Sequence, residues 1–319
     1  MAISECDARR AVVLVDGAGA DEFRAVRDAL TDAWDIPVVL LGPAELARSA
    51  VCWDAEAGVL SVDGGRVRPA VVWTRHCSPG TLVARASLTA TGADAWSGLF
   101  TALTAAADAA LPGPARGHHP HLAQARRLGV RVPRTLVTTG PADGVPGSPR
   151  TVVKHPDFRL TEPDPRCWAP YLPVITEKVA AATPGRPVVV QEYIEHDHEL
   201  RVYHLDGTLC AFRVAKHDPA AMWTDPAGVE VTPVVCPPAA ASVVRRLASG
   251  WGLRYAAFDL LVTRTSEVVF LEANPDGDWL WFERRARWHG VSLPAAVMVR
   301  ELFARTTSTG DRADERADT

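Results

Sequence analysis

The sequence lacks any run of 18 apolar residues, any signal-peptide pattern at its start, and any Cys-x-x-Cys pair. The first two absences argue against a membrane span and against secretion. Its six cysteines are scattered, which indicates reduced thiols rather than a disulfide framework or a zinc site. A net charge of −4 provides no basic surface for nucleic acid or an anionic membrane. We therefore expect a cytoplasmic protein with no nucleic-acid and no membrane partner.

Lysine is also scarce, because it occupies only three positions and 31 of the 34 basic residues are arginine. Lys154 ends the strand-like run at residues 151–153, where solvation alone explains a retained lysine poorly. A compact ammonium that contacts phosphate oxygens is one explanation. The other is a strand-end lysine that reaches solvent.

What the chain does contain is an ordinary globular composition, with 47% hydrophobic and 23% charged residues among 319, enough for two or three domains. The first elements alternate strand, helix and strand, which is typical of an α/β domain. The polar residues from 306 onward predict a disordered tail. The hydrophobic patterns predict strands near 11–16, 37–41, 59–62, 70–76, 130–138, 151–154, 187–193, 199–214 as a hairpin, 255–262 and 268–274, and helices near 21–34, 94–110, 121–129, 237–250 and 292–305.

The last predicted hairpin carries the most informative polar residues. If it is symmetric about its turn, Val262 pairs with Val269 and Asp259 lies opposite Glu272. Asn274 follows two positions after Glu272 and therefore shares its face. Taken singly, such residues are often strand ends or buried hydrogen-bonded groups. Together they form an oxygen-only cluster that suits Mg²⁺, and burying several carboxylates without a cation would be costly.

Upstream segments carry residues suited to a nucleotide. The strand that ends in Gln191, Glu192, Tyr193 and Ile194 can offer main-chain N–H and C=O groups to an adenine ring. Further along, Glu199 can accept from ribose hydroxyls, Arg201 can hold an anion, and Arg213 lies on the partner strand. The alternative for Glu199 and Arg201 is a solvated strand face.

The order of these motifs resembles the ATP-grasp ligase superfamily: a lysine strand, Q-E-Y-I, E-L-R-V-Y, F-D-L-L-V and F-L-E-A-N-P. The segments D-W-L-W-F-E, L-G-V-R-V-P-R-T-L-V-T and V-V-W-T-R-H-C-S-P resemble the branch of graspetide (microviridin-type) synthetases and ribosomal protein S6 glutamate ligase. The resemblance implies α/β and α+β domains in an ATP-grasp fold, with ATP held between two antiparallel sheets. The implied domains are 1–115 (amino-terminal), 116–195 (central) and 196–305 (carboxy-terminal).

The resemblance also implies roles for the candidate residues. ATP would be bound by Lys154, by the hinge at 191–194 and by Glu199, and two Mg²⁺ ions by Asp259, Glu272 and Asn274. Arg201 and Arg213 would stabilise the acyl phosphate or the tetrahedral state after it.

The implied activity is an ADP-forming ligase that makes an amide or ester bond through an acyl phosphate, on a peptide in specialised metabolism. A carboxylate substrate and a nucleophilic acceptor would be its partners, and a homodimer is common in such families. Alternatives are a ligase of free amino acids, an ATP-grasp kinase, and a non-catalytic ATP-binding protein.

The chain departs from the family pattern at three places. Histidines, including His119 and His121, stand where the family commonly has another lysine, and could contact phosphate or simply be solvated. The segment 155–173, expected to cover the phosphates, contains no glycine. Residues 216–229 lack the Asp-x-Arg element that positions the acceptor peptide in graspetide synthetases.

Overall fold

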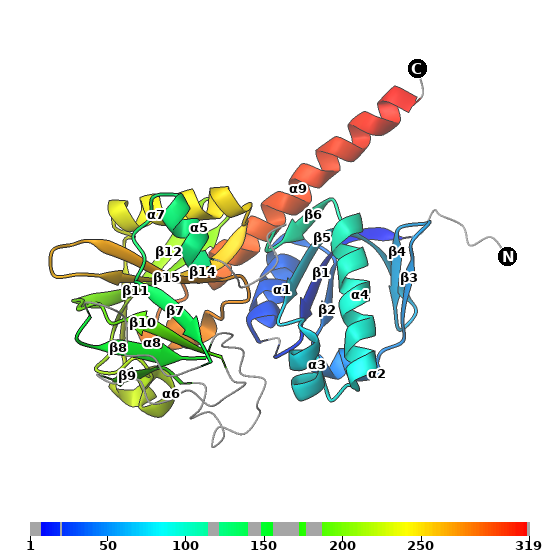
Figure 1. Ribbon diagram of the computed structural model, residues 1–319. Helices are drawn as coiled ribbons and strands as arrows, with labels where there is room; N and C mark the ends of the chain where they lie inside the picture. The colour runs from blue at the N-terminus through cyan, green and yellow to red at the C-terminus, as the bar shows by residue number, and fades with distance from the viewer. Residues whose placement is uncertain are drawn as a thin grey trace.

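A computed structural model describes residues 8–19, 21–113, 121–139, 148–155, 172–176 and 187–317, with the main chain alone for 121 and 307–317. Three β-sheets and their covering helices make up this part of the chain (Figure 1). The strands are β1 (Arg9–Asp16), β2 (Val38–Leu41), β3 (Val51–Asp54), β4 (Val59–Val62), β5 (Gly65–Arg75), β6 (Ala109–Leu111), β7 (Thr135–Thr138), β8 (Thr151–Lys154), β9 (Val174–Thr176), β10 (Val188–Glu192), β11 (His198–Leu205), β12 (Thr208–Ala215), β13 (Glu230–Val234), β14 (Tyr255–Val262) and β15 (Val268–Asn274). The helices are α1 (Asp21–Trp34), α2 (Pro43–Arg48), α3 (Pro79–Ala86), α4 (Ala90–Ala106), α5 (His121–Arg127), α6 (Ala221–Thr224), the 3₁₀ turn η4 (Pro226–Gly228), α7 (Pro238–Trp251), α8 (Leu280–Ala286) and α9 (Ser292–Ala317).

The amino-terminal sheet is mixed and has the order β2-β1-β5-β4-β3, with β6 beside β5. Its strands β1, β2, β5 and β6 are parallel to one another, and β4 is antiparallel to β5. Along β1, Val12 and Leu14 pack toward α1 and α9, whereas Val13 and Val15 pack toward α2, α3 and α4. Because both faces are covered, the strand reads as a continuous apolar run rather than an alternating one.

The carboxy-terminal sheet is antiparallel, with the order β13-β12-β11-β14-β15. One face packs on α5 and α7, and we call it the helix face. The other face carries Tyr203, Phe212 and Ala257, whose cluster continues through α8 and α9 into the amino-terminal core. We call it the seam face.

The central sheet is antiparallel and has the order β7-β10-β8-β9. The predicted pair of antiparallel sheets is therefore confirmed. Strands of the three sheets fall within the three predicted domain ranges, and the boundaries themselves stay a prediction. No helix in the described ranges is both long and apolar enough to cross a membrane.

Two predicted helices differ from those observed. The helix expected at 94–110 starts earlier, at Ala90, because the Thr89 side chain accepts from the N–H of Gly92 at 3.1 Å and caps it. Its expected last turn is instead the strand β6, which pairs with β5. The closing helix does not end at 305 but continues to Ala317. Strands β3, β9 and β13 and helices α2, α3, α6 and α8 were not predicted.

Candidate functional site

The hairpin of β14 and β15 brings the predicted oxygen ligands onto the seam face. Asp259 lies opposite Glu272, as predicted, and Asn274 lies opposite Ala257, the next position on the same face. The pairing nearer the turn was predicted wrongly, because Val262 pairs with Val268 and not with Val269. A bulge at Leu271 restores the register.

Packing explains why the bulge is needed. Phe270 and Ala273 are three residues apart, yet both are buried in the core on the helix face. Strict alternation would turn one of them outward, so one extra residue is inserted between them. The same insertion sets Glu272 and Asn274 on the seam face.

Arg201 of β11 lies opposite Asp259 and binds it directly. Its Nη1 donates to both carboxylate oxygens, at 3.0 and 2.8 Å. Burial raises the pKa of Asp259, the charge of Arg201 opposes that rise, and the nearby Glu272 adds to it. Asp259 is half-buried and takes up the charge of Arg201, while Glu272 beside it adds a second carboxylate, so the pair can accept a further cation.

The donor set fits Mg²⁺ bound together with a nucleotide. In the described ranges no group of three or more His, Cys, Asp or Glu side chains is arranged to hold a metal ion. The predicted set instead has two carboxylates and the Asn274 amide, whose oxygen also accepts from the N–H of Asp276 at 2.9 Å. Mg²⁺ commonly uses one or two carboxylates and completes its shell with water and phosphate oxygens. Asp259, Glu272 and Asn274 are thus suited to that mode rather than to an all-protein cage.

Lys216 joins the seam face, a placement that the sequence patterns did not predict. Its Nζ lies 3.0 Å from Glu199 Oε2 and donates to the main-chain oxygen of Pro219 at 3.1 Å. The charge of Lys216 acts to lower the pKa of Asp259. Two signals point to it: the scarcity of lysine, and the two-residue alternation that puts position 216 on the same face as Phe212 and Val214.

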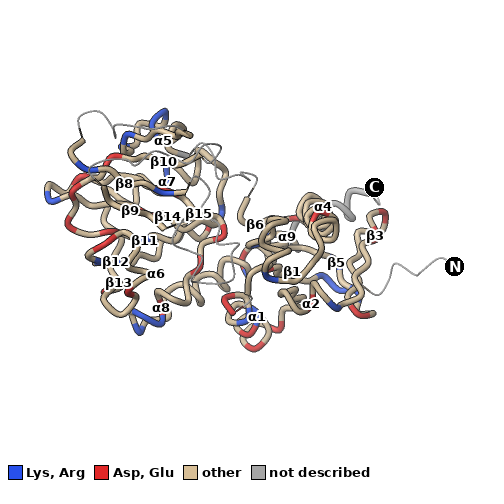
Figure 2. The backbone as a smooth tube through the Cα atoms, turned by 60° about the horizontal axis from the view of Figure 1, so that its bottom comes forward, with Lys and Arg blue, Asp and Glu red and all other residues tan. Residues whose placement is uncertain are grey.

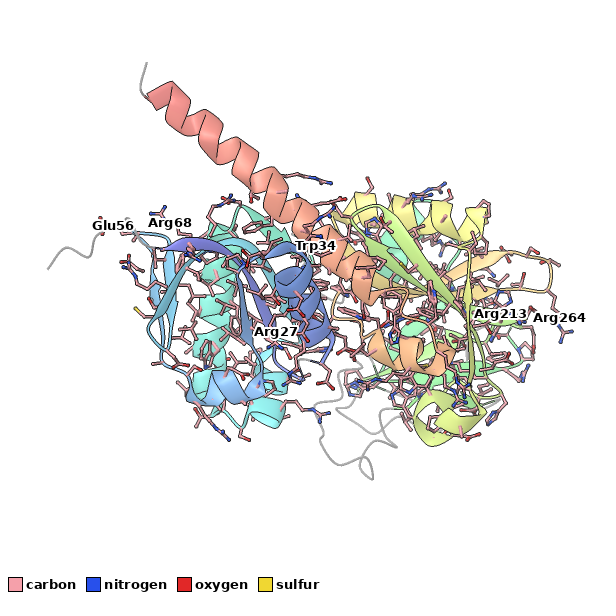
Figure 3. All side chains as sticks on the ribbon, turned by 180° about the vertical axis from the view of Figure 1, so that it is seen from behind. Arg27, Trp34, Glu56, Arg68, Arg213 and Arg264 are labelled. Carbon is pink, nitrogen blue, oxygen red and sulfur yellow. The ribbon has the colours of Figure 1, made fainter. Side chains whose placement is uncertain are left out.

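Arg213 lies on the strand beside Arg201, as predicted, but on the other side of the sheet, so the two do not face one site together. Arg213 is opposite Leu200, which is buried on the helix face. Its Nη2 lies 3.4 Å from Asp197 Oδ2, and Figure 3 shows it on the side turned away from the amino-terminal domain. The reason is the register: Phe212 lies opposite Arg201 on the seam face, so its neighbour points away.

In the central sheet, Lys154 and Gln191 share one face. Lys154 lies opposite Val189, and Gln191 lies opposite Val152. Lys154 makes no ion pair with any described residue, so its charge is free for a ligand. The Gln191 side chain already makes a hydrogen bond within the protein, since its amide donates to Thr135 Oγ1 at 2.9 Å.

The predicted adenine hinge follows directly. The N–H of Glu192 donates to Arg134 O at 2.8 Å, and that of Tyr193 donates to Arg150 O at 3.1 Å. Hydrogen bonds from Arg134 outweigh partial burial and lower the pKa of Glu192. For Ile194, no partner of its N–H is found among the described residues. The N–H of Ile194 is therefore the hinge group that can still bind a base edge, while its main-chain oxygen lies 2.8 Å from His196 Nδ1.

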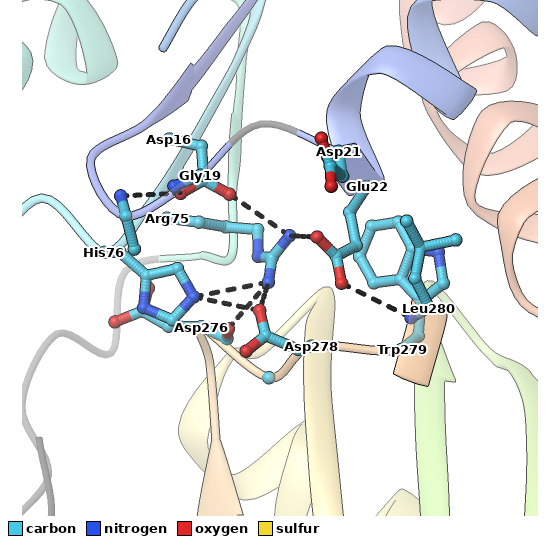
Figure 4. A network of polar contacts seen from close by, with 12 residues as sticks. Asp16, Gly19, Asp21, Glu22, Arg75, His76, Asp276, Asp278, Trp279 and Leu280 are labelled. Carbon is cyan, nitrogen blue, oxygen red and sulfur yellow. Dashed lines mark hydrogen bonds and ion pairs between the residues drawn. The ribbon is translucent and has the colours of Figure 1, made fainter. Parts of the chain in front are cut away.

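A buried network joins the turn after Asn274 to the amino-terminal domain (Figure 4). Arg75 is 0% exposed and lies 3.3 Å from Asp16 Oδ2 and 3.9 Å from Glu22 Oε2. It also forms an ion pair with Asp278 and donates to the main-chain oxygen of Asp276 at 3.0 Å. We call Asp16, Glu22, Arg75, His76 and Asp278 the seam cluster. The sequence patterns did not predict it, although Asp16 and Arg75 each end an apolar strand.

The seam cluster is linked to Arg201 through Tyr203. The Tyr203 hydroxyl donates to the main-chain oxygen of Asp278 at 2.5 Å, and Arg201 Nε lies 3.3 Å from that hydroxyl. Gly277 is required between them, because a Cβ there would overlap Ala257 and come within 2.9 Å of Arg201 Nη2. The turn after Asn274 is thus held against both the metal ligands and the amino-terminal sheet.

No protein-family model and no curated protein matches the chain. Its structure is similar to that of the ATP-grasp ligase PsnB complexed with minimal precursor, Mg and ADP, with a TM-score of 0.64 and 20% identity, over 96% of this chain and 100% of that one. The chain has the ATP-grasp fold.

Two further ATP-grasp structures extend the comparison. The macrocyclase MdnC from Microcystis aeruginosa MRC, bound with precursor peptide MdnA, gives a TM-score of 0.63 at 17% identity, over 91% of this chain and 99% of that one. The D-alanyl-alanine synthetase A from Vibrio cholerae gives a TM-score of 0.56 at 12% identity, over 94% and 100%. The ATP-grasp fold predicted from the motifs is confirmed.

Some predicted elements lie outside the described residues. They include nearly all of the glycine-free segment at 155–173, His119, and the side chain of His121. The region 216–229, which lacks an Asp-x-Arg element, is described and folds into α6 and η4.

Proposed function

We propose that this ATP-grasp chain is an ADP-forming ligase that joins a peptide carboxylate to an amine or hydroxyl through an acyl phosphate. The observation that carries the proposal is the pairing of Asp259 with Glu272 and Arg201 on the seam face. Solved structures with this fold and similar chain length include PsnB and MdnC, each complexed with a precursor. They support a peptide substrate over other carboxylates.

The residues would divide the work as follows. Lys154 and Lys216 would hold phosphate oxygens, and the main chain at 191–194 would hold the adenine ring. Asp259, Glu272 and Asn274 would hold Mg²⁺, with room for two ions if phosphates and water complete each shell. Bound ATP and Mg²⁺ supply the transferable phosphoryl group and neutralise its charge.

Arg201 would stabilise the negative charge that forms on the carbonyl oxygen when the nucleophile attacks. Its guanidinium is held by Asp259 and Tyr203, lies over the rings of Tyr203 and Phe282 at 5.3 and 5.2 Å, and is therefore oriented before substrate binds. Preorganised donors of this kind stabilise developing charge more than solvent can. We do not assign Arg213 to this role, because it faces the other side of the sheet.

The test is an assay for ADP and for trapped acyl phosphate. The chain is incubated with ATP, Mg²⁺ and a panel of acidic peptides, and hydroxylamine converts an acyl phosphate into a hydroxamate. Glu272→Gln should reduce both products by about 100-fold, since losing a metal ligand costs about 3 kcal/mol of transition-state stabilisation. Glu267→Gln, an exposed position at the turn of the same hairpin, should leave both unchanged. Absence of ADP and hydroxamate with every carboxylate would refute the ligase.

The similarity to D-alanyl-alanine synthetase A supports a second candidate, a ligase of free amino acids. The panel therefore also contains free amino acids, alone and in pairs. Hydroxamate formed from amino acids but from no peptide would favour this second candidate. A stable phosphorylated product without hydroxamate would indicate a kinase, and ATP binding without turnover a non-catalytic protein.

Two broader expectations accompany the proposal. A homodimer is expected, and sedimentation or light scattering of the full chain tests it. A cytoplasmic location is expected from the reduced cysteines, and fractionation tests it. Figure 2 shows acidic and basic positions interspersed along the described chain.

A further inference from the structure

The seam cluster contains one group that the nucleotide chemistry does not use. His76 directly follows β5 and has φ 51°, a left-handed conformation that is uncommon outside glycine. Its Nε2 lies 3.1 Å from Asp278 Oδ1 and 3.3 Å from Arg75 Nη2. Its Nδ1 has no hydrogen-bond partner among the described residues, and the side chain is 22% exposed. Nε2 is therefore fixed by its contacts, whereas Nδ1 can still bind a proton or a substrate group.

His76 stands where an α/β sheet usually binds its ligand. β1 lies between β2 and β5 and is parallel to both, so the strand order reverses at β1. Asp16 and Arg75 are paired at the carboxyl ends of β1 and β5. Ligands of open parallel sheets bind in the crevice outside these ends, at the point of reversal. At Gly17 a Cβ would overlap the main-chain oxygen of His76, so the two loops approach closely beside that crevice.

The carboxyl ends of β1 and β5 also adjoin the proposed acyl-phosphate site. Asp278, which holds His76, lies four residues after the metal ligand Asn274. The Asp278 main chain accepts from Tyr203, and Tyr203 contacts Arg201. Arg201 also contributes to the lowered pKa of Asp278, although Arg75 and His76 contribute more. The carboxyl ends of β1 and β5 therefore meet the seam face beside the metal ligands.

We propose that His76 is the proton acceptor of the coupling step, and that the attacking amine or hydroxyl of the substrate binds in this crevice. The inference rests on the proposed ligase function. The nucleophile forms a bond to the acyl carbon, the bond from that carbon to the phosphate oxygen breaks, and inorganic phosphate leaves with its electron pair. The proton released from nitrogen or oxygen passes to Nδ1 of His76. Asp278 is the positioning residue, since it accepts from Nε2–H and stabilises the imidazolium.

The electrostatics agree with this role. Burial and Arg75 act to lower the pKa of His76, but Asp278 and Asp16 raise it above 6.5 overall. The charged groups that face the ring are Asp16 from β1, Arg75 from β5 and Asp278 from the turn after β15. A base must be neutral to accept a proton, so coupling should increase as the pH rises through this pKa.

The experiment separates activation from coupling. His76→Gln keeps an amide donor for Asp278 but has no basic nitrogen. Hydroxylamine is a strong nucleophile that needs no base, so hydroxamate formation should stay within about twofold of the parent. Coupling to the acceptor found in the substrate panel should fall by about 100-fold, the lower end of a general-base contribution, and lose its rise with pH. His289→Gln, which removes an exposed histidine 3.8 Å from Glu283, should change neither rate.

Several results would overturn the inference. Unchanged coupling in His76→Gln, or an equal loss of hydroxamate and of coupled product, would exclude a proton acceptor. If His76→Gln fails to fold, His76→Asn takes its place, because asparagine tolerates the left-handed conformation. If the parent chain forms no hydroxamate with any carboxylate, the ligase function fails and the role of His76 fails with it. Hydroxamate formation in the parent with normal coupling in the variant refutes His76 alone.

Discussion

The strongest stability prediction concerns Arg75→Met, which keeps most of the side-chain volume and removes a fully buried charge. Asp16 then loses a partner at 3.3 Å and Glu22 one at 3.9 Å, while Asp278 is 58% exposed and can be solvated. Removing one member of a buried ion pair costs about 3–5 kcal/mol. Lost contacts with Trp279 and Phe23, at 4.9 and 5.3 Å, add to this cost. At about 2–4 °C per kcal/mol, Tm should fall by about 6–20 °C.

Thermal and urea denaturation of the full chain measure the loss. The control is Arg27→Met, which removes an exposed arginine 2.7 Å from Asp28 and should cost at most about 1 kcal/mol. Because the penalty comes from uncompensated carboxylates, it should shrink as the pH falls toward about 4. A loss below about 1 kcal/mol for Arg75→Met, or a loss that does not depend on pH, would refute the electrostatic account of the seam cluster.

Three further measurements test other parts of the structure. Gly277→Ala should lower the free energy of unfolding by about 1–3 kcal/mol, because its Cβ would overlap Ala257 and approach Arg201; urea titration measures it, with the unobstructed helix position Gly98→Ala as a control that should stabilise by about 0.5–1 kcal/mol. Lys216→Ala should raise KM for ATP by about tenfold, the effect of losing one charged contact of about 1.4 kcal/mol, and Lys216→Arg should restore part of it; an unchanged KM for Lys216→Ala would remove Lys216 from the phosphate site. The raised pKa of His76 means that its contribution to stability is complete below about pH 6.5 and is lost as the pH rises through the folded-state value, so unfolding from pH 6 to 9 should show a decline that His76→Gln lacks; a parallel decline in both proteins would contradict this assignment.

The metal hairpin could be predicted because its signal is local. Alternation along two strands joined by a short turn predicts the hairpin and the polar residues on it. Asp259 lies opposite Glu272 as predicted only because the bulge at Leu271 offsets the wrong pairing at the turn. The pairing of Val262 could not be predicted in this way. It depends on the bulge, which in turn depends on Phe270 and Ala273 packing against α5 and α7, outside the hairpin.

Sequence patterns could predict neither the face of the sheet on which Arg213 lies nor the contacts of the seam cluster, because both depend on how strands are aligned with one another. The choice of face for Arg213 follows from which β12 residue lies opposite Arg201, and a shift of one residue reverses it. Arg75 and Asp278 are 203 positions apart, and no periodicity links residues across such a separation. The sequence does show that these residues are charged and that they stand at the ends of apolar strands or after the Asn-Pro turn.

Helix α9 has a consequence for how the chain is made. Its Val299 and Leu302 belong to the same core as Val12 and Phe23 of the first strand and helix. During synthesis, domains generally fold from the amino terminus as they emerge from the ribosome. Here one face of the first sheet stays uncovered until α9 has been synthesised. The amino-terminal domain therefore cannot complete its core before α9 has been synthesised, and a chain truncated before Ser292 exposes that apolar surface to chaperones.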